Sequence, residues 1–407
     1  MAVHHPSTPW QVKHGHDLLD IGAESSRPWQ RRRCMIPDAT IDTPLHPLYT
    51  RADVSLRTVP AIERRSPMSA QQAAGWTRRR FLGGLTLAGT AGLLGVHPRP
   101  GAAEPPPETT KLRVLQFQSI CQAPLYVTDE LLHLEGFTDV QFVKTMGGVL
   151  ATNLAAGEVD IGMNFVAPNL VRLDAGDPLV VLAGGHIGCL ELFGTEDVRT
   201  LRDLKGKTVA LAFGLGSADH VFISTFAAYV GLNPSRDINW VTHPMDEAVR
   251  LFAEGKVDAY MGSPPTAQEL RAKKIGHVVL NTAVDRPWSQ YFCCMIIAHR
   301  DFVHRHPVAT KRAIRAILKG ADLCALQPDR AAQILVDKDF TQDYGTALQA
   351  MKELPYGRWR EYDPEDTVRF YALRLYEIGM IKSTPQKIIA QGTDWRFLNE
   401  LKKELKG

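Results

Sequence analysis

From Lys111 onwards, the amino-acid sequence predicts an α/β fold built from two similar lobes. Short apolar runs alternate with longer amphipathic segments, a pattern typical of parallel strands joined by crossover helices. Residues 154–162 and residues 251–259 both contain the pattern Ala-x-Gly-x-Val-Asp, about one hundred residues apart. A repeat of this length favours two related lobes over a short-period solenoid.

The first lobe is predicted to begin with four strands joined by three helices. Gly157 ends the second of these helices, because glycine readily adopts the left-handed conformation that follows many helices. The predicted strands are 112–117, 140–143, 160–163 and 179–183, and the predicted helices are 124–134, 149–156 and 166–175.

The second lobe is predicted to repeat this alternation of strands and helices, and the rest of the chain is predicted to be mostly helical. Its predicted strands are 207–211, 238–241 and 257–261, with helices at 218–230 and 245–253. After a further apolar strand at 291–298, helices are predicted at 307–326, 328–336, 344–353 and 364–378, followed by a terminal helical stretch from residue 395. These last helices have no strands of their own, so we expect them to pack on the first lobe.

An export signal is predicted at residues 68–103. Two adjacent arginines, Arg78 and Arg79, precede a Phe-Leu pair and a short uncharged stretch with several glycines, and small residues end at Ala103. This is the pattern of a bacterial twin-arginine signal. The alternative is an N-terminal anchor helix, which the shortness of the apolar stretch disfavours. We expect cleavage after Ala103 to release the mature protein into the periplasm.

Residues 1–67 show no helical or strand periodicity and are rich in proline and arginine clusters. Because a signal peptide normally starts near the N-terminus, we interpret Met68 as the true start of translation and 1–67 as an over-extended reading frame. The alternative is a disordered leader. Peptides upstream of Met68 in the precursor would contradict the first interpretation.

The composition of the remaining 304 residues excludes several functions. They hold 34 basic and 37 acidic residues, a net charge of −3, which gives no electrostatic case for binding nucleic acid. No later apolar run is long enough for a membrane span. Five cysteines remain, without CxxC or zinc-type spacing, so we expect buried apolar cysteines, no metal site and no cofactor. Their odd number leaves at least one thiol free.

Several motifs, in order along the chain, give it a family resemblance. The chain resembles the periplasmic substrate-binding proteins of ABC importers, in the nitrate, sulfonate and taurine group (SsuA-like and NMT1-like) that is related to thiamine-precursor binders. The matching stretches are 123–127, 154–162, 201–210, 216–220, 255–259, and Asp301-Phe302 with Pro307. The resemblance covers essentially all of residues 111–400.

The resemblance implies a two-lobe periplasmic binding protein type II fold with a helical C-terminal tail on the first lobe. The first lobe would comprise 111–190 plus 290–407 and the second 195–285, joined by two crossover strands. Because crossover strands of this fold run side by side, either a Cys189–Cys293 or a Cys189–Cys294 disulfide could form. The protein would be a monomer that delivers a small-molecule ligand to ABC permease and ATPase subunits, with no chemistry and no stable membrane insertion after cleavage.

Ligands of open α/β sheets bind beyond the carboxyl ends of the strands, which points to loops in both lobes. The predicted ligand-binding residues are Ser119, Cys121, Gln122, Gly148, Asn164, His186, Gly216, Ser217, His220 and Ser263. Gly216 and Ser217 begin a helix whose free N–H groups could hold an anionic head group. Ser217 could equally cap that helix, and His220 could pack rather than bind.

One departure from the family narrows the range of expected ligands. Sulfonate binders of the group tend to carry an aromatic residue and Asp-Pro after the last strand of the second lobe, where this chain has Gly-Ser-Pro-Pro at 262–265. We therefore expect a small organic ligand with an anionic or strongly polar head rather than an alkanesulfonate. Two rival functions stay open: a thiamine-pyrimidine-synthase-like enzyme, faintly indicated by Phe292-Cys293-Cys294, and a periplasmic sensor that presents its ligand to a membrane kinase.

Overall fold

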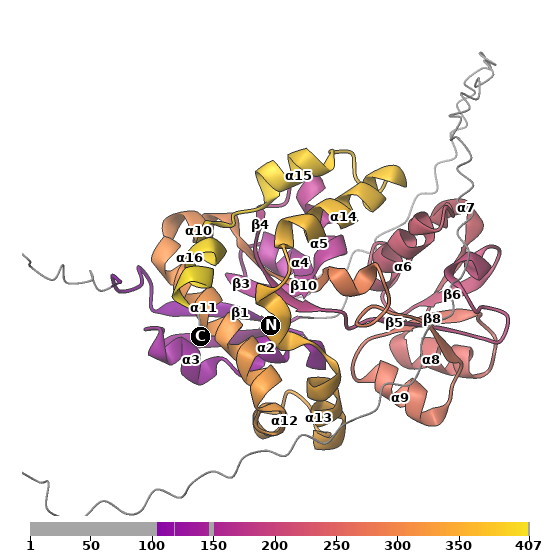
Figure 1. The fold of residues 1–407 in the computed structure, drawn as a ribbon, viewed down its shortest axis with the longest axis horizontal. Coiled ribbons are helices and arrows are strands. Elements are labelled where there is room, and N and C mark those ends of the chain that lie inside the picture. Colours follow the sequence, from indigo (N-terminus) through magenta and orange to yellow (C-terminus); the bar gives the residue numbers. More distant parts are fainter. Residues whose placement is uncertain (1–103, 118, 146–149, 406–407) are drawn as a thin grey trace, which may run out of the picture. The chain divides into compact units, whose positions relative to one another are not determined.

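The computed structural model of the chain describes residues 104–117, 119–145 and 150–405 (Figure 1). The predicted leader and export signal, 1–103, lie outside the described residues, and so does Gly148. Two five-stranded mixed sheets with helices around them form the described chain. The predicted two-lobe α/β fold class is therefore confirmed at the level of the sheets.

The first sheet has the strand order β2-β1-β3-β10-β4. β1 pairs in parallel with β2 and β3, whereas β10 runs antiparallel between β3 and β4. The strands are β1 (Lys111–Gln116), β2 (Asp139–Lys144), β3 (Ile161–Phe165), β4 (Leu179–Ile187) and β10 (Phe292–His299). The connecting helices are η2 (Ile120–Gln122), α2 (Ala123–Tyr126), α3 (Asp129–Leu134), α4 (Leu150–Ala155) and α5 (Val166–Asp174).

The second sheet has the order β7-β6-β8-β5-β9, with β5 antiparallel between β8 and β9. The strands are β5 (Glu191–Gly194), β6 (Thr208–Leu211), β7 (Asn239–Thr242), β8 (Ala259–Gly262) and β9 (His277–Asn281). Its helices are η3 (Leu201–Leu204), α6 (Ala218–Tyr229), α7 (Pro234–Asp237), α8 (Met245–Ala253), α9 (Thr266–Lys273) and η4 (Trp288–Gln290). The sequence analysis did not predict α9 and β9, which lie between the Gly-Ser-Pro-Pro turn and the second crossover.

Each sheet contains one antiparallel strand that arrives from the other sheet. The chain leaves β4 of the first sheet to form β5 in the second, and it leaves β9 of the second sheet to form β10 in the first. The two sheets thereby share one topology, in which β10 of the first corresponds to β5 of the second. The crossovers are residues 188–190 and 282–291, and both lead into the site described below.

The two aspartates of the internal repeat have the same structural role in the two sheets. Asp160 and Asp258, the aspartates of the two Val-Asp pairs, precede β3 and β8. Oδ2 of Asp160 accepts the backbone N–H of Arg113 at 2.8 Å, and Oδ2 of Asp258 accepts that of Thr208 at 2.7 Å. Each aspartate therefore fixes the start of one strand against the first strand of its sheet. The repeated motif sets the register of both sheets.

One predicted helix is divided in the structure. The predicted helix 124–134 consists of α2 and α3, separated at Val127 and Thr128. The hydroxyl of Thr128 donates to the carbonyl oxygen of Leu125, so this side chain bonds to the backbone locally at the break. Threonine competes in this way with helical hydrogen bonding.

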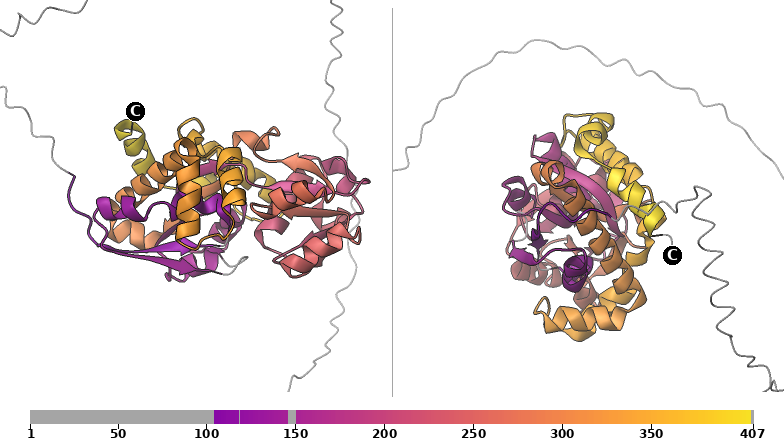
Figure 2. Two further views of the ribbon diagram at one scale, coloured as in Figure 1. Left: turned by 90° about the horizontal axis from the view of Figure 1, so that it is seen from below. Right: turned by 90° about the vertical axis from the view of Figure 1, so that its left-hand side faces the viewer.

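The C-terminal helices gather around the first sheet (Figures 1 and 2). α11, α15, α16 and η5 contact β4, and α14 packs against α5, as predicted for a helical tail on the first lobe. The bounds are α10 (Arg300–Arg305), α11 (Pro307–Leu326), α12 (Pro328–Asp337), α13 (Tyr344–Glu353), η5 (Tyr356–Arg360), α14 (Pro364–Glu377), α15 (Pro385–Gly392) and α16 (Arg396–Glu404). Among the described helices, none has the length and apolar character that crossing a membrane would require.

Candidate functional site at the crossovers

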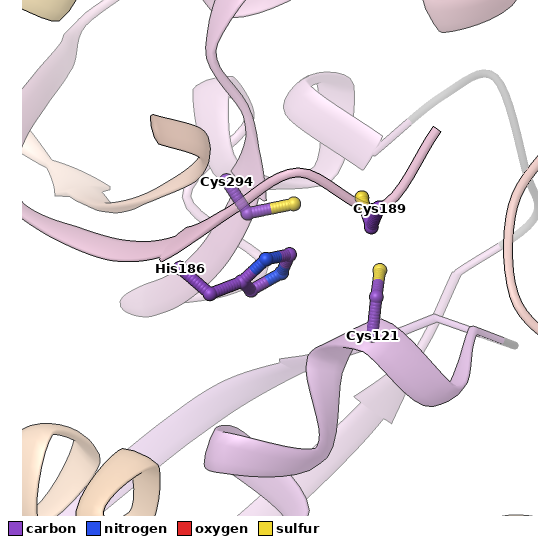
Figure 3. A group of neighbouring side chains, drawn as sticks. All are labelled: Cys121, His186, Cys189 and Cys294. Carbon is purple, nitrogen blue, oxygen red and sulfur yellow. The ribbon is translucent and has the colours of Figure 1, made fainter. Parts of the chain in front are cut away.

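Three cysteines and a histidine from distant parts of the sequence point toward one another beside the crossovers (Figure 3). They are Cys121, His186, Cys189 and Cys294. The thiol sulfurs and one imidazole nitrogen all lie within 4.8 Å of one another, and all four side chains are buried. The group brings together η2, the end of β4, the first crossover and the start of β10.

Cys121 is placed by a tightly held turn after β1. The hydroxyl of Tyr126 accepts the N–H of Phe117 at 3.0 Å and donates to the carbonyl oxygen of Phe117, which fixes the end of β1 against α2. The hydroxyl of Ser119 lies 3.1 Å from the sulfur of Cys121. Both predicted residues, Ser119 and Cys121, are therefore buried in the site.

Cys189 is placed by the first crossover, which lies close against the segment after β9. Oγ1 of Thr282 accepts the N–H groups of Cys189 and Leu190 at 3.2 and 3.0 Å and donates to the carbonyl oxygen of Leu190. Gly188 has φ +45°, and a Cβ atom there would lie 2.3 Å from the backbone of Ala283. Only glycine allows this approach of the two backbones.

The start of β10, directly after the second crossover, contributes Cys293 and Cys294. Cys294 pairs with Phe165 of β3 and with His186 of β4. The sulfur of Cys293 lies 3.0 Å from that of Cys189, and both thiols are free. The disulfide that the resemblance suggested for this pair stays a prediction, because the structure brings the sulfurs together without bonding them.

His186 presents one nitrogen to the cluster. Nδ1 lies 3.2 Å from the carbonyl oxygen of Ile187, and since a carbonyl can only accept, Nδ1 carries the proton. Nε2 is then left with a lone pair, and it is buried without a hydrogen-bond partner among the residues that the structure describes. The ring is fully buried and packs against the ring of Tyr356, with centroids 5.3 Å apart.

The buried thiols share negative charge. Hydrogen bonds from the thiols of Cys189 and Cys294 lower the pKa of Cys121 well below its usual value, and His186 acts in the same direction. Burial raises the pKa of Cys189 and of Cys294 well above the usual value. Burial opposes a charge on His186, but its contact with Cys121 outweighs this effect and raises the pKa. The hydrogen bonds from its neighbours therefore favour the thiolate form of Cys121 over that of Cys189 and Cys294.

Gln122 is a second unusual group at this end of the first sheet. Its side chain is fully buried, yet within the described part of the chain neither amide atom, Oε1 or Nε2, has a hydrogen-bond partner. Next to it, the hydroxyl of Ser119 donates to the carbonyl oxygen of Pro264, after β8, at 3.3 Å. The predicted loop thus lies where the two sheets meet.

Asn164 is buried close by but uses its side chain locally. Nδ2 donates to Oδ1 of Asn169 at 3.1 Å, and Oδ1 accepts the N–H of Phe165 at 2.7 Å. These bonds hold the end of β3 against the first turn of α5. Its role as a ligand contact stays a prediction.

The predicted residues at the start of α6 form a separate network in the second sheet. Ser217 is the N-cap residue, but its hydroxyl makes no cap bond; it contacts the carbonyl oxygen of Gly214 and Oδ1 of Asp219. The N–H of Gly216 donates to Nδ1 of His220 at 3.0 Å. Burial lowers the pKa of His220. These groups bond to one another, and none of them belongs to the thiol cluster.

Ser263, the last predicted residue, is half-buried in the turn after β8.

Cys189 and Cys294 were not among the predicted ligand-binding residues, although both were predicted as possible disulfide partners. Sequence reasoning missed these two residues. It also missed Glu353 of α13, whose Oε2 accepts from Arg271 of α9 at 2.5 Å and from Gln268 at 3.0 Å. These bonds join helices of the two sheets beside the site.

The sequence of this chain matches a known protein family. The model of the NMT1-like family matches residues 105–336, more than half of the chain. The chain belongs to the NMT1-like family. The family predicted from the sequence motifs is therefore confirmed.

Solved structures similar to this NMT1-like protein share its fold. The periplasmic nitrate-binding protein NrtA from Synechocystis PCC 6803 is 16% identical, with a TM-score of 0.62 over 74% of this chain and 90% of NrtA. The alkanesulfonate-binding protein SsuA from Xanthomonas axonopodis pv. citri is 18% identical, with a TM-score of 0.54 over 69% of this chain and 96% of SsuA. At such identities the similarity concerns the fold.

One curated relative of this NMT1-like protein is the bicarbonate-binding protein CmpA of Synechococcus elongatus. The two are 24% identical over 125 residues, which is 30% of this chain. The match spans 27% of the length of CmpA.

Proposed function

We propose that this NMT1-like protein is the solute-binding component of an ABC importer. It would hold a small polar or anionic solute between the lobes 111–190 plus 290–407 and 195–285, and deliver it to a membrane permease and its ATPase. The observation that carries the proposal is the fully buried amide of Gln122, which has no hydrogen-bond partner among the described residues. Ser119, three residues before it, contacts Pro264 after β8 of the second sheet. Buried polar groups normally have partners, and a bound solute would supply them.

The geometry around Gln122 supports a site that closes on its ligand. Ser119 on the first-sheet side already contacts Pro264 on the second-sheet side. Both belong to loops at the carboxyl ends of parallel strands, β1 and β8, where open α/β sheets bind their ligands. A solute that bridges these loops would stabilise the closed arrangement, which is the form that a permease would receive.

The chemistry of the loop favours a small solute with a polar or anionic head. The Nε2 group of Gln122 and the hydroxyl of Ser119 are neutral donors, which suit oxygen atoms of a nitrate, carboxylate or bicarbonate group. The relatives NrtA, SsuA and CmpA are named for nitrate, alkanesulfonate and bicarbonate binding. The small Gly-Ser-Pro-Pro turn after β8 still disfavours a bulky sulfonate in this chain.

The proposal includes the periplasm as the place of action. The twin-arginine pattern before Ala103 would export the folded protein, and cleavage there would release it as a monomer. The protein would bind and release its solute without chemical change.

A thermal-shift screen of the purified full-length chain tests this function. The panel contains nitrate, bicarbonate, aliphatic and aromatic carboxylates, sulfonates and pyrimidines. A solute at one hundred times its dissociation constant should add about 2.7 kcal/mol of stability. A hit that is recovered unchanged after incubation supports the proposal. No shift with any solute, or chemical conversion of the hit, would reject it.

A further inference from the structure

We propose that Cys121, Cys189, Cys294 and His186 bind a zinc ion that joins the short helix η2 to the first crossover and to the strands β4 and β10. The three sulfurs and one imidazole nitrogen form a compact donor set, all within 4.8 Å of one another. Three thiolates and one imidazole in a tetrahedron are a donor set of structural zinc sites. The cysteine spacing predicted no metal site, because the four ligands come from three segments and only His186 and Cys189 are close in the sequence.

The distances fit a tetrahedral ion after a small contraction. With Zn–S bonds of about 2.3 Å, neighbouring ligand atoms of a tetrahedron lie about 3.8 Å apart. The four donor atoms lie at most 4.8 Å apart, so each would have to move by about 1 Å or less. Figure 3 shows the side chains directed at a common centre, so that rotation of thiol groups rather than backbone movement would complete the site.

In its neutral form, the histidine has the tautomer that a metal requires. Nδ1 donates to the carbonyl oxygen of Ile187, which leaves the lone pair on Nε2. That nitrogen is buried, and no hydrogen-bond partner for it exists among the described residues. A buried nitrogen acceptor without a partner costs free energy, and a metal ion would remove that cost.

The charge of the group favours a divalent cation. When zinc binds, the three thiols release their protons to solvent, and the buried assembly of three thiolates and Zn²⁺ carries a net charge of −1. Cys293 then has a role of its own. Its thiol, 3.0 Å from the sulfur of Cys189, can donate a hydrogen bond to that thiolate. Zinc is preferred to Cu⁺ because the monovalent ion would leave one more uncompensated buried charge.

A Cys189–Cys293 disulfide is the competing state. Its formation would remove two electrons and two protons from the pair and would take Cys189 out of the donor set. Zinc binding therefore requires the reduced chain, and the test is carried out on protein reduced and desalted without air. Zinc is added and free zinc is removed by gel filtration before metal content is measured by mass spectrometry.

The expected result is about one zinc ion per wild-type chain, lost in Cys294→Ser and in His186→Ala. One variant serves as a matched control and should keep its zinc: Cys324→Ser, at a buried cysteine of α11 outside the group. Loss of zinc in Cys293→Ser with retention in Cys189→Ser would contradict the assigned ligands. Absence of zinc from the reduced wild type would overturn the site itself.

Cobalt keeps the test decisive if a variant fails to fold. Co²⁺ in the reduced wild-type chain should give the thiolate-to-metal charge-transfer absorption and the strong visible bands of a tetrahedral sulfur-rich site. Addition of zinc should displace cobalt and abolish these bands. Cobalt spectra of an octahedral oxygen site, or no bound cobalt, would reject the proposal without any variant.

Discussion

A buried amide group without a hydrogen-bond partner costs free energy, and both amide atoms of Gln122 lack a partner within the part of the chain that the structure describes. Its neighbour Cys121 faces the thiol cluster, so the short helix η2 serves two sites. A polar solute contacts Gln122 in the proposed importer function, and a zinc ion contacts Cys121 in the further inference. Each proposal can fail without the other.

The first prediction concerns Gln122→Ala. In the ligand-free chain, removal of an unpaired amide should leave the free energy of unfolding unchanged or raise it by up to about 1 kcal/mol, since relief of the buried polar group offsets the small cavity. The same variant should lose the stabilisation by the solute found in the screen. Urea unfolding with and without solute measures both effects.

Gln333→Ala, an exposed glutamine of α12, is the control and should keep the solute effect. A loss of more than about 2 kcal/mol in ligand-free Gln122→Ala would show that Gln122 supports the fold instead of the ligand.

The second prediction concerns pH and His220. Burial lowers the pKa of this histidine below its unfolded value of about 6.5, so the unfolded chain binds more protons in the interval between the two values. Stability from this group is therefore complete above pH 6.5 and is lost as the pH falls through the folded pKa. Protonation would also break the acceptor bond that Nδ1 makes to the N–H of Gly216.

His220→Gln should flatten the decrease in melting temperature below pH 6.5 relative to the wild type. His304→Gln, at an exposed position of α10, should leave the profile unchanged. An identical acid profile for His220→Gln and the wild type would contradict this account.

At the scale of elements, the helix α11 lies very close to α2. A Cβ atom at Gly320 would lie 2.4 Å from the carbonyl oxygen of Pro124 and 2.9 Å from Cγ2 of Thr128. This contact holds η2 and its Cys121 from behind, because α2 follows η2 directly. The glycine is needed for space, since its backbone is helical.

The third prediction follows from that contact. Gly320→Ala should lower the free energy of unfolding by about 1–3 kcal/mol, as overpacking does in other cores. Gly345→Ala in α13 meets only the Asp343 side chain at 3.2 Å, and its higher helix propensity should leave stability unchanged or increase it. Equal stability of the two variants in urea unfolding would refute the proposed close packing.

Local pattern explains which elements could be predicted from the sequence. The strand β1 and the long helix α11 have clear apolar periodicity, and Gly157 and Gly255 both adopt positive φ where the repeat predicted helix ends. α9 was missed because it is largely polar, and β9, which follows it, was missed although it is no shorter than β6, β7 and β8. The break between α2 and α3 depends on one hydroxyl bond, which periodicity does not reveal.

The candidate site was predictable only in part, for a geometric reason. Ser119, Cys121, Gln122 and His186 follow or end strands, so the rule for open sheets identified them. Cys189 belongs to the first crossover and Cys294 to β10, which follows the second, and their approach to Cys121 depends on the exchange of strands between sheets. No spacing in the sequence encodes that juxtaposition.

At the scale of the whole described chain, a small group of polar side chains, here called the latch, connects elements of the two sheets. It consists of Glu353, Arg271, Gln268 and Glu191. Glu353 of α13 bonds to Arg271 and Gln268 of α9, and Arg271 also lies 3.4 Å from Glu191 of β5. If a solute binds the closed arrangement, contacts that favour closure must also favour binding. The latch should therefore raise the affinity without touching the solute.

The fourth prediction tests that linkage. Glu353→Ala should weaken solute binding by up to about fivefold, since a partly exposed ion pair contributes about 1 kcal/mol or less. Glu361→Ala, which removes an ion pair with Arg358 inside the C-terminal segment, is the control and should bind normally. Unchanged affinity in Glu353→Ala would show that the latch has no part in closure.

Calorimetric titration of the full-length wild type and of Gln122→Ala with the solute identified in the screen tests the central claim most directly. The account predicts a single solute bound per wild-type chain, recovered chemically unchanged, and no measurable heat of binding in Gln122→Ala at the same concentrations. Equal affinity of the two proteins would contradict the claim that the solute binds at the buried amide where the two sheets meet.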